Sequence, residues 1–339
     1  MNRIKAILQQ LKGMAPMNTF FDEWLESKQH LKAQSIRTYT QFVDGYLRPA
    51  FGETAIKDIS RARVQAFVDA MEENYSAKTI HEVYRCLKAV LELAVSQRIL
   101  VENPCVGITL PTKEKPRAQA LSDKEQRALG KALGKSTNPL DLSILLALKL
   151  GLRLSEVVAL RWKDIEFKEN FMVIRHSMER VPTGEGHQTK ARLGTPKTKN
   201  SQRKIPLPGD FAAKLKSYYD QLNVKQKKST SFVVSKKDGS AYHGRTIERH
   251  FKKRGCELGL SPAYTFHSLR HSFATQAMES GVAVKVISVL LGHSKTATTT
   301  EIYLHLSEQF IREEMMKMNQ EQKKKHRRKK TKEPLEYAA

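Results

Sequence analysis

The 339-residue sequence contains only three cysteines, and none is part of a Cys-x-x-Cys pair. Cys86, Cys105 and Cys256 are too widely separated to indicate a disulfide framework, so we expect reduced, structural thiols in a cytoplasmic protein. The 11 histidines lack metal-ligand spacing, and the carboxylates do not cluster as they do in two-metal nucleases. The sequence therefore predicts no metal site.

Long apolar runs are also missing from the chain. No stretch approaches the length of a membrane span and no signal peptide precedes the first domain, so no membrane partner is expected. Positive charge is in excess, at +24 with a pI near 9.9, which indicates a polyanionic partner. Most of it lies in residues 113–312, with 36 Lys and Arg against 18 Asp and Glu. A ribosomal or chromatin protein could carry this charge, but usually with fewer hydrophobic residues than the 40% found here.

The N-terminal third has the apolar spacing of an all-helical domain. After a short helical extension at residues 1–16, residues 17–112 predict four helices. The second of these is expected to stop near Pro49. The third and fourth follow Ser60 and Ser76, which are suited to be N-caps.

A second domain is expected at residues 113–312, entered through a charged, proline-bearing linker at 111–119. Its patterns combine helices with short alternating strands, so the chain as a whole is predicted to be mainly α with a small antiparallel β-sheet. The expected elements are a helix after Ser122, an apolar helix at 140–150 ending at Gly151, a helix capped by Ser155, strands at 171–175 and 204–207 separated by a polar loop at 182–194, an edge strand at 232–234, and helices over 244–318.

Polar residues suited to phosphodiester chemistry recur along this second domain. Three residues apart, His267 and Arg270 lie on one face of a helix. Guanidinium groups can hold the non-bridging oxygens of a phosphate, a tyrosine hydroxyl can attack it, and histidine and lysine can move protons. Together they could attack a phosphodiester without a metal. The set is Arg153, Lys197, His267, Arg270, His293 and Tyr303.

Each of these motifs alone is a weak signal, because surface pairs, helix ends and core tyrosines look the same. Their order and spacing together resemble the tyrosine recombinase (phage integrase) family over about residues 17–310. The motifs are Gly-Leu-Arg153-Leu-Ser-Glu156, Pro-Lys197-Thr-Lys199, His267-Ser-Leu-Arg270, Leu-Gly-His293 and Tyr303.

The resemblance implies a role for each motif residue. Arg153 and Arg270 would grip the phosphate, and Tyr303 would be the nucleophile. His267 would handle a proton, and His293 would donate a hydrogen bond to the scissile phosphate. Glu156 would act from behind these groups and hold the site together.

The general acid is a choice between two lysines. Lys197 and Lys199 point the same way if they lie in a β-hairpin, so alternation cannot separate them. The family motif Lys-Thr favours Lys197 and leaves Lys199 as a phosphate contact. A plain surface lysine is the alternative for both.

The helical domain would clasp the DNA, according to the same resemblance. Lys78, Arg85 and Lys88 share the face of the fourth helix that is opposite its apolar stripe, and Arg37 lies near the start of the second helix. On charge alone, a solvated helix face is the favoured explanation for these residues. The resemblance favours phosphate contacts.

The family resemblance implies a site-specific DNA recombinase that acts in DNA integration or excision. The enzyme would form a 3′-phosphotyrosyl intermediate on double-stranded DNA and work as a homo-tetramer, without ATP, metal or other cofactor. Accessory DNA-bending or directionality factors could assist it. We expect a bacterial or phage-encoded protein, cytoplasmic and associated with the nucleoid when bound to DNA.

The C-terminal part is expected to comprise a helix at 306–318 and a basic tail within 313–339, in which Lys323 to Lys332 hold eight Lys and Arg. The helix could dock on its own domain or on a neighbouring subunit. Many integrases also carry an arm-binding domain, which sixteen N-terminal residues cannot supply. Two rival functions are a type IB topoisomerase and a non-enzymatic DNA-binding protein, but the latter should lack a motif residue and none is missing.

Overall fold

The computed structural model describes residues 11–113, 119–182, 189–194 and 202–292. The chain divides into two compact units, described here one at a time. The first comprises residues up to 116 together with 180–192, and the second comprises 117–179 and residues from 193 onward.

No helix within the described ranges is long and apolar enough to cross a membrane. The expected C-terminal helix at 306–318, the basic tail and residues 1–10 lie outside those ranges.

Residues 11–113 of the first unit are helical, and the apolar faces of these helices build one core. Ser60 and Ser76 are the N-caps predicted from the sequence, since their side chains accept hydrogen bonds from the backbone N–H groups of Arg63 and Thr79. The helices are α2 (Met17–Ser27), α3 (Ala33–Phe42), α4 (Arg48–Phe51), α5 (Arg61–Glu72) and α6 (Ala77–Ser96), with a 3₁₀ turn, η2, at Ile56–Asp58.

The second helix was expected to stop near Pro49, but the chain stays helical through that position. α3 continues without a break through a π-helical turn, η1 (Val43–Leu47), into α4, which ends at Phe51. A proline inside an α-helix has no N–H to donate, and its ring collides with the carbonyl four residues earlier. The wider π turn directly before Arg48 and Pro49 accommodates the ring, so the chain stays helical.

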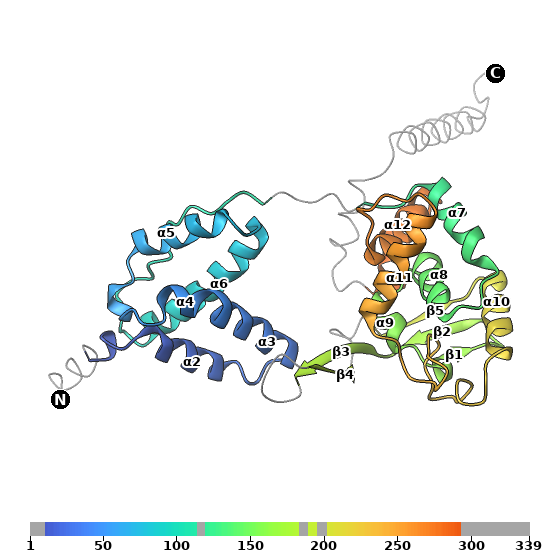
Figure 1. Cartoon of the computed structure of the whole chain (residues 1–339), viewed down its shortest axis with the longest axis horizontal. Helices are drawn as coiled ribbons and strands as arrows, with labels where there is room; N and C mark the ends of the chain where they lie inside the picture. The colour runs from blue at the N-terminus through green and yellow to red at the C-terminus, as the bar shows by residue number, and fades with distance from the viewer. Residues whose placement is uncertain (1–10, 114–118, 183–188, 195–201, 293–339) are drawn as a thin grey trace, which may run out of the picture. The chain divides into compact units, whose positions relative to one another are not determined.

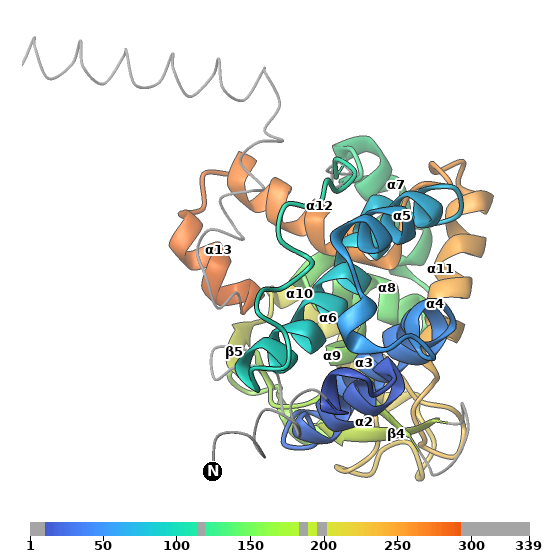
Figure 2. The same ribbon diagram turned by 90° about the vertical axis from the view of Figure 1, so that its left-hand side faces the viewer.

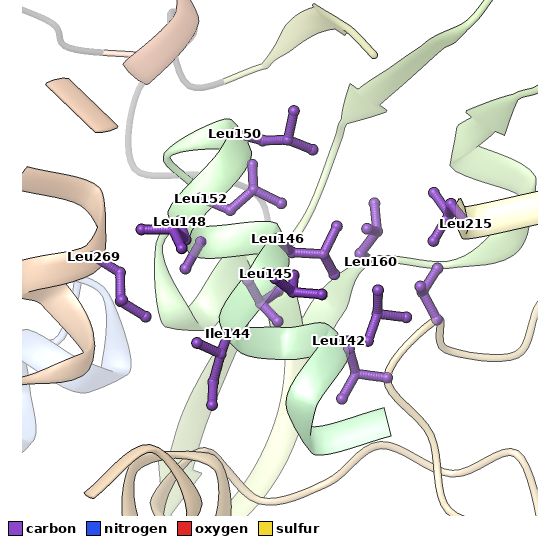
Figure 3. Packing of buried hydrophobic residues seen from close by; sticks show 14 of the residues in the cluster. Leu142, Ile144, Leu145, Leu146, Leu148, Leu150, Leu152, Leu160, Leu215 and Leu269 are labelled. Carbon is purple, nitrogen blue, oxygen red and sulfur yellow. The ribbon is translucent and has the colours of Figure 1, made fainter. Parts of the chain in front are cut away.

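The second unit is organised around α8 (Pro139–Leu150), which is apolar on nearly every side. Figure 3 shows its leucines and Ile144 pointing in several directions into one cluster. α8 packs against α7 (Asp123–Gly134), α11 (Gly244–Glu257) and α12 (Phe266–Glu279) (Figure 1). Ser122 caps α7, as predicted. A helix that is hydrophobic all round must be buried, and α8 is the centre of this core.

The predicted antiparallel sheet is present. β1 (Ile165–Glu166), β2 (Phe171–Ile174) and β5 (Arg203–Pro206) form a three-stranded sheet in the order β1-β2-β5, with Ile174 opposite Arg203. The fold class, mainly α with a small antiparallel sheet, is therefore confirmed. The edge strand expected at 232–234 is wrong, because this segment makes only an isolated bridge to Arg161.

The loop expected at 182–194 is wrong in its second half. β4 (Thr189–Gly194) pairs with β3 (Ser177–Pro182) in a separate two-stranded sheet (Figure 1). Lys190, Ala191 and Arg192 are exposed. The strand therefore lacks the alternation of buried apolar and exposed polar residues by which a strand is predicted from sequence. Backbone hydrogen bonds between the strands do not need that pattern.

The described part of the second unit contains three further helices: α9 (Leu154–Ala159), α10 (Gly209–Asp220) and α13 (Val284–Leu291). A 3₁₀ turn, η3, spans Trp162–Asp164. Figure 2 shows α13 beside α12, against which it packs. The expectation that Ser155 caps α9 is wrong. Ser155 lies inside the first turn, and Arg153 occupies the N-cap position. The carboxylate of Glu156 accepts a hydrogen bond from the backbone N–H of Arg153 and thereby caps the helix.

Gly151 is the point at which α8 must stop. Its φ is 66°, and a Cβ there would lie 2.6 Å from Cδ1 of Phe273 and 2.7 Å from Cδ2 of Leu291. We expect Gly151→Ala to destabilise the second unit by about 1–3 kcal/mol through strain and overpacking. Urea unfolding measures this. Gly130→Ala is the matched control, because nothing lies within 4 Å of a Cβ at Gly130 in α7, and equal effects of the two changes would refute the prediction.

Candidate phosphate-binding site

Arg153 and Glu156 lie at the junction of α8 and α9, where the left-handed Gly151 turns the chain. The Arg153 N–H donates to Oε2 of Glu156 at 3.0 Å, and Nη1 of Arg153 donates to Oε1 at 2.7 Å. The Arg153 side chain is 32% exposed, whereas that of Glu156 is 4% exposed. Arg153 can therefore meet a ligand while its carboxylate partner stays in the interior.

Arg270 enters the same site from α12 and is buried. Nη1 donates to the carbonyl of Gly151 at 2.8 Å, and Nη2 donates to the carbonyl of Leu291 at 2.6 Å. No carboxylate of the described residues lies within ion-pair distance of it. Burial, followed by the positive charge of Arg153, lowers the pKa of Arg270 to about 9, so it remains a cation at pH 7.

Arg203, on β5, is a site residue that the sequence reasoning did not assign. Its Nη1 and Nη2 donate to Oε1 and Oε2 of Glu156, each at 2.9 Å, in a two-bond pair with both side chains almost fully buried. One signal could have found it. Arg203 alternates with Ile205 on the inward face of the strand, a position otherwise reserved for apolar residues.

The carboxylate of Glu156 is shared by two arginines. Burial alone would raise its pKa, but the hydrogen bonds and charge of Arg203, with the charge of Arg153, lower that pKa to about 2. Three guanidinium groups against one carboxylate leave a net charge of about +2 at the site. Such a site attracts an oxyanion, and the planar forks of arginine suit a phosphate.

His267 lies one turn before Arg270 on α12 and is exposed. Its ring makes an edge-to-face contact with His271, with centroids 4.6 Å apart. Although the residue as a whole is exposed, desolvation of its ring, followed by the positive charges of His271, Arg270 and Arg153, lowers the pKa of His267 to about 4. The imidazole is therefore neutral at pH 7 and able to accept a proton.

Four of the predicted site residues lie outside the described ranges: Lys197, Lys199, His293 and Tyr303. The structure brings Arg153, Glu156, His267 and Arg270 together.

The residues predicted to contact DNA in the first unit differ in exposure and in ion pairing. Lys78 and Lys88 are exposed on α6, and Arg37 is half-buried on α3. Arg85 is exposed but pairs with Glu82, which offsets its charge. Across the described residues, no group of three or more His, Cys, Asp or Glu could hold a metal ion.

Comparisons with known proteins identify the family of the chain. Residues 119–309 match the phage integrase family, and residues 17–109 match the phage integrase central domain. A "Tyrosine recombinase XerC-like" protein of Caldanaerobacter subterraneus subsp. tengcongensis is 29% identical over 270 residues, which cover 74% of this chain and 68% of the relative.

Solved structures share the fold at low sequence identity. The integrase of transposon Tn1549 in complex with transposon right end DNA superposes with a TM-score of 0.76 at 20% identity, covering 90% of this chain and 100% of the other. A lambda integrase tetramer bound to a Holliday junction gives a TM-score of 0.66 at 16% identity, covering 87% and 80%.

The chain belongs to the phage integrase family, the tyrosine recombinases. It is accordingly a site-specific DNA recombinase, and the activity predicted from the motifs is confirmed.

The shared carboxylate makes stability dependent on acid pH. Because the folded pKa of Glu156 is about 2, below its ordinary value of 4.5, its contribution is complete above pH 4.5 and is lost as the pH falls through 2. Glu156→Gln should lower the unfolding free energy by about 3 kcal/mol at pH 7. The deficit should shrink toward pH 2. Urea unfolding across pH 2–7 measures it, with the exposed Glu248→Gln as the control; a deficit independent of pH would contradict the prediction.

Proposed function

We propose that the chain cleaves and rejoins double-stranded DNA at specific sites through a covalent 3′-phosphotyrosyl link to Tyr303. The observation that carries this is the convergence of Arg153 and Arg270, with His267 beside them, in a site of net positive charge. Arg153 and Arg270 each use two of their five N–H donors in described bonds, so the remaining donors can hold a phosphate.

In this reaction His267 takes the proton of the Tyr303 hydroxyl, and the phenolate oxygen attacks phosphorus. The bond from phosphorus to the 5′-oxygen breaks, and Lys197 gives that oxygen a proton. Arg153 and Arg270 balance the charge that develops on the non-bridging oxygens, and His293 donates a further hydrogen bond. The 5′-hydroxyl of a partner strand then reverses these steps. The bond energy is kept in the link, so no ATP, metal or other cofactor takes part.

Residues 17–112 act as the core-binding DNA domain and 113–312 as the catalytic domain, with an extension at 1–16 and a tail at 313–339. Lys78, Lys88, Arg85 and Arg37 are the phosphate contacts of the first.

The second unit offers a basic helix next to the site. Arg245, Arg249 and Lys253 are exposed on α11 at four-residue spacing, which places them along one side of the helix. A Cβ added at Gly244, where α11 begins, would lie 3.4 Å from Leu154, the neighbour of Arg153. A DNA backbone held at Arg153 can therefore continue along α11.

Four copies would exchange strands on two DNA sites. The lambda integrase tetramer on a Holliday junction, which has the same fold, supports this assembly. The reaction serves DNA integration or excision in the bacterial cytoplasm, on nucleoid DNA, and accessory bending or directionality factors would set its direction.

The test of the nucleophile is Tyr303→Phe, which removes only the hydroxyl. We expect DNA binding to be retained and the covalent complex to be lost, as judged by denaturing gels of protein with labelled DNA. Tyr75→Phe, an exposed tyrosine in the first unit, is the control and should form the complex normally. A covalent band that persists in Tyr303→Phe would assign the nucleophile to another residue.

The general acid is tested with a DNA substrate that carries sulfur at the 5′-bridging position, because that leaving group needs no proton. Lys197→Ala should cleave ordinary DNA slowly and the sulfur substrate at a rate close to wild type. Lys199→Ala should show only a modest defect on either substrate. Single-turnover cleavage measures both, and rescue of Lys199→Ala instead would transfer the role to Lys199.

A further inference from the structure

The carbonyls of the last two residues of α13 and of its C-cap, Gly292, are each held by a different arginine. Nε of Arg203 donates to the carbonyl of Leu290 at 2.5 Å, Nη2 of Arg270 to that of Leu291 at 2.6 Å, and Nη2 of Arg153 to that of Gly292 at 3.2 Å. Carbonyls at the end of a helix have no partner within the helix, so side-chain donors must satisfy them when they are buried. The arginines thereby fix the point where the chain passes to His293.

Arg203 differs from the other two arginines in exposure. Its side chain is 3% exposed, against 32% for Arg153, so a DNA phosphate cannot reach it. It binds both oxygens of Glu156, whereas the Arg153 side chain binds one. Without Arg203, Arg153 alone would neutralise the charge of this buried carboxylate. A neutral Arg153–Glu156 pair would hold a phosphate weakly.

We propose that Arg203 is a positioning residue of the recombination reaction. It neutralises Glu156, which leaves the charge of Arg153 for the scissile phosphate, and it fixes the end of α13 beside that phosphate. The proposal rests on the proposed function, in which Arg153 and Arg270 hold the phosphate.

The test compares four variants: Arg203→Met, Arg203→Lys, Glu156→Gln and the double variant Arg203→Met/Glu156→Gln. Single-turnover formation of the covalent complex is measured on a nicked DNA substrate at saturating DNA. Arg203→Met should be slower by roughly 10- to 100-fold, the range found when a group that orients a catalytic ligand is removed.

The double variant carries the decisive result. Adding Glu156→Gln to Arg203→Met restores the net charge of the site, so the double variant should be faster than Arg203→Met, although below wild type because Leu290 keeps its unpaired carbonyl. Damage of a purely structural kind would make the double variant as slow as Arg203→Met or slower. Arg203→Lys should be intermediate, since one ammonium cannot bind both oxygens of Glu156 and a carbonyl in the same fork.

Arg254→Met is the matched control. Arg254 binds both oxygens of the buried Asp141, at 3.0 and 2.7 Å, away from the phosphate site. Its loss leaves a buried carboxylate with one partner fewer, and it should leave the cleavage rate of folded protein unchanged. Thermal unfolding shows that each variant is folded at the assay temperature. If Arg203→Met does not fold, Arg203→Lys with and without Glu156→Gln gives the same comparison.

The outcomes separate the two hypotheses. A wild-type protein that forms no covalent complex would overturn the proposed function and the role of Arg203 with it. A wild-type protein that cleaves, together with an Arg203→Met rate equal to wild type or a double variant no faster than Arg203→Met, would overturn the role of Arg203 alone.

Discussion

The pairing of the buried Glu156 carboxylate with two guanidinium groups is the interaction on which the site depends. Through it, α9 is tied to β5 by Arg203, and the half-buried Arg153 is held at the junction of α8 and α9. Two buried opposite charges lose hydration, so such a pair contributes little net stability, but loss of one partner leaves an uncompensated charge. The pair therefore sets an arrangement more than it adds to the stability of the fold.

Backbone carbonyls supply the stabilisation of the three arginine cations that the single carboxylate cannot provide. Three arginines repel one another, and one glutamate neutralises only one of them. The remaining stabilisation comes from the C-terminal ends of two helices, where Gly151 ends α8 and Gly292 ends α13. These ends carry partial negative charge and unpaired carbonyls. Dipoles stabilise the cations without cancelling their charge, so the site keeps about +2 for its ligand.

Sequence patterns were sufficient for features that depend on neighbouring residues. The caps at Ser60, Ser76 and Ser122, the apolar helix that ends at Gly151, and the shared face of His267 and Arg270 all follow from local spacing. Features that depend on distant partners were not predictable in this way. Arg203 meets Glu156 across 47 positions of the chain, and β4 is defined by its pairing with β3. The cap at Ser155 was misplaced because the helix already begins at Leu154: the N–H of Val157 donates to the carbonyl of Arg153, and the carboxylate of Glu156 accepts the N–H of Arg153.

Arg270 shows why this arrangement suits a phosphate in the proposed reaction. It is buried, bonded to two neutral carbonyls and placed near the like charge of Arg153, and each of these conditions makes its charge costly in the free protein. A phosphate supplies the countercharge that the protein withholds, and its charge on the non-bridging oxygens increases as the nucleophile attacks. The guanidinium is already fixed by Gly151 and Leu291, so no reorientation is needed at that moment. The cost is met during folding, and the gain is largest in the transition state.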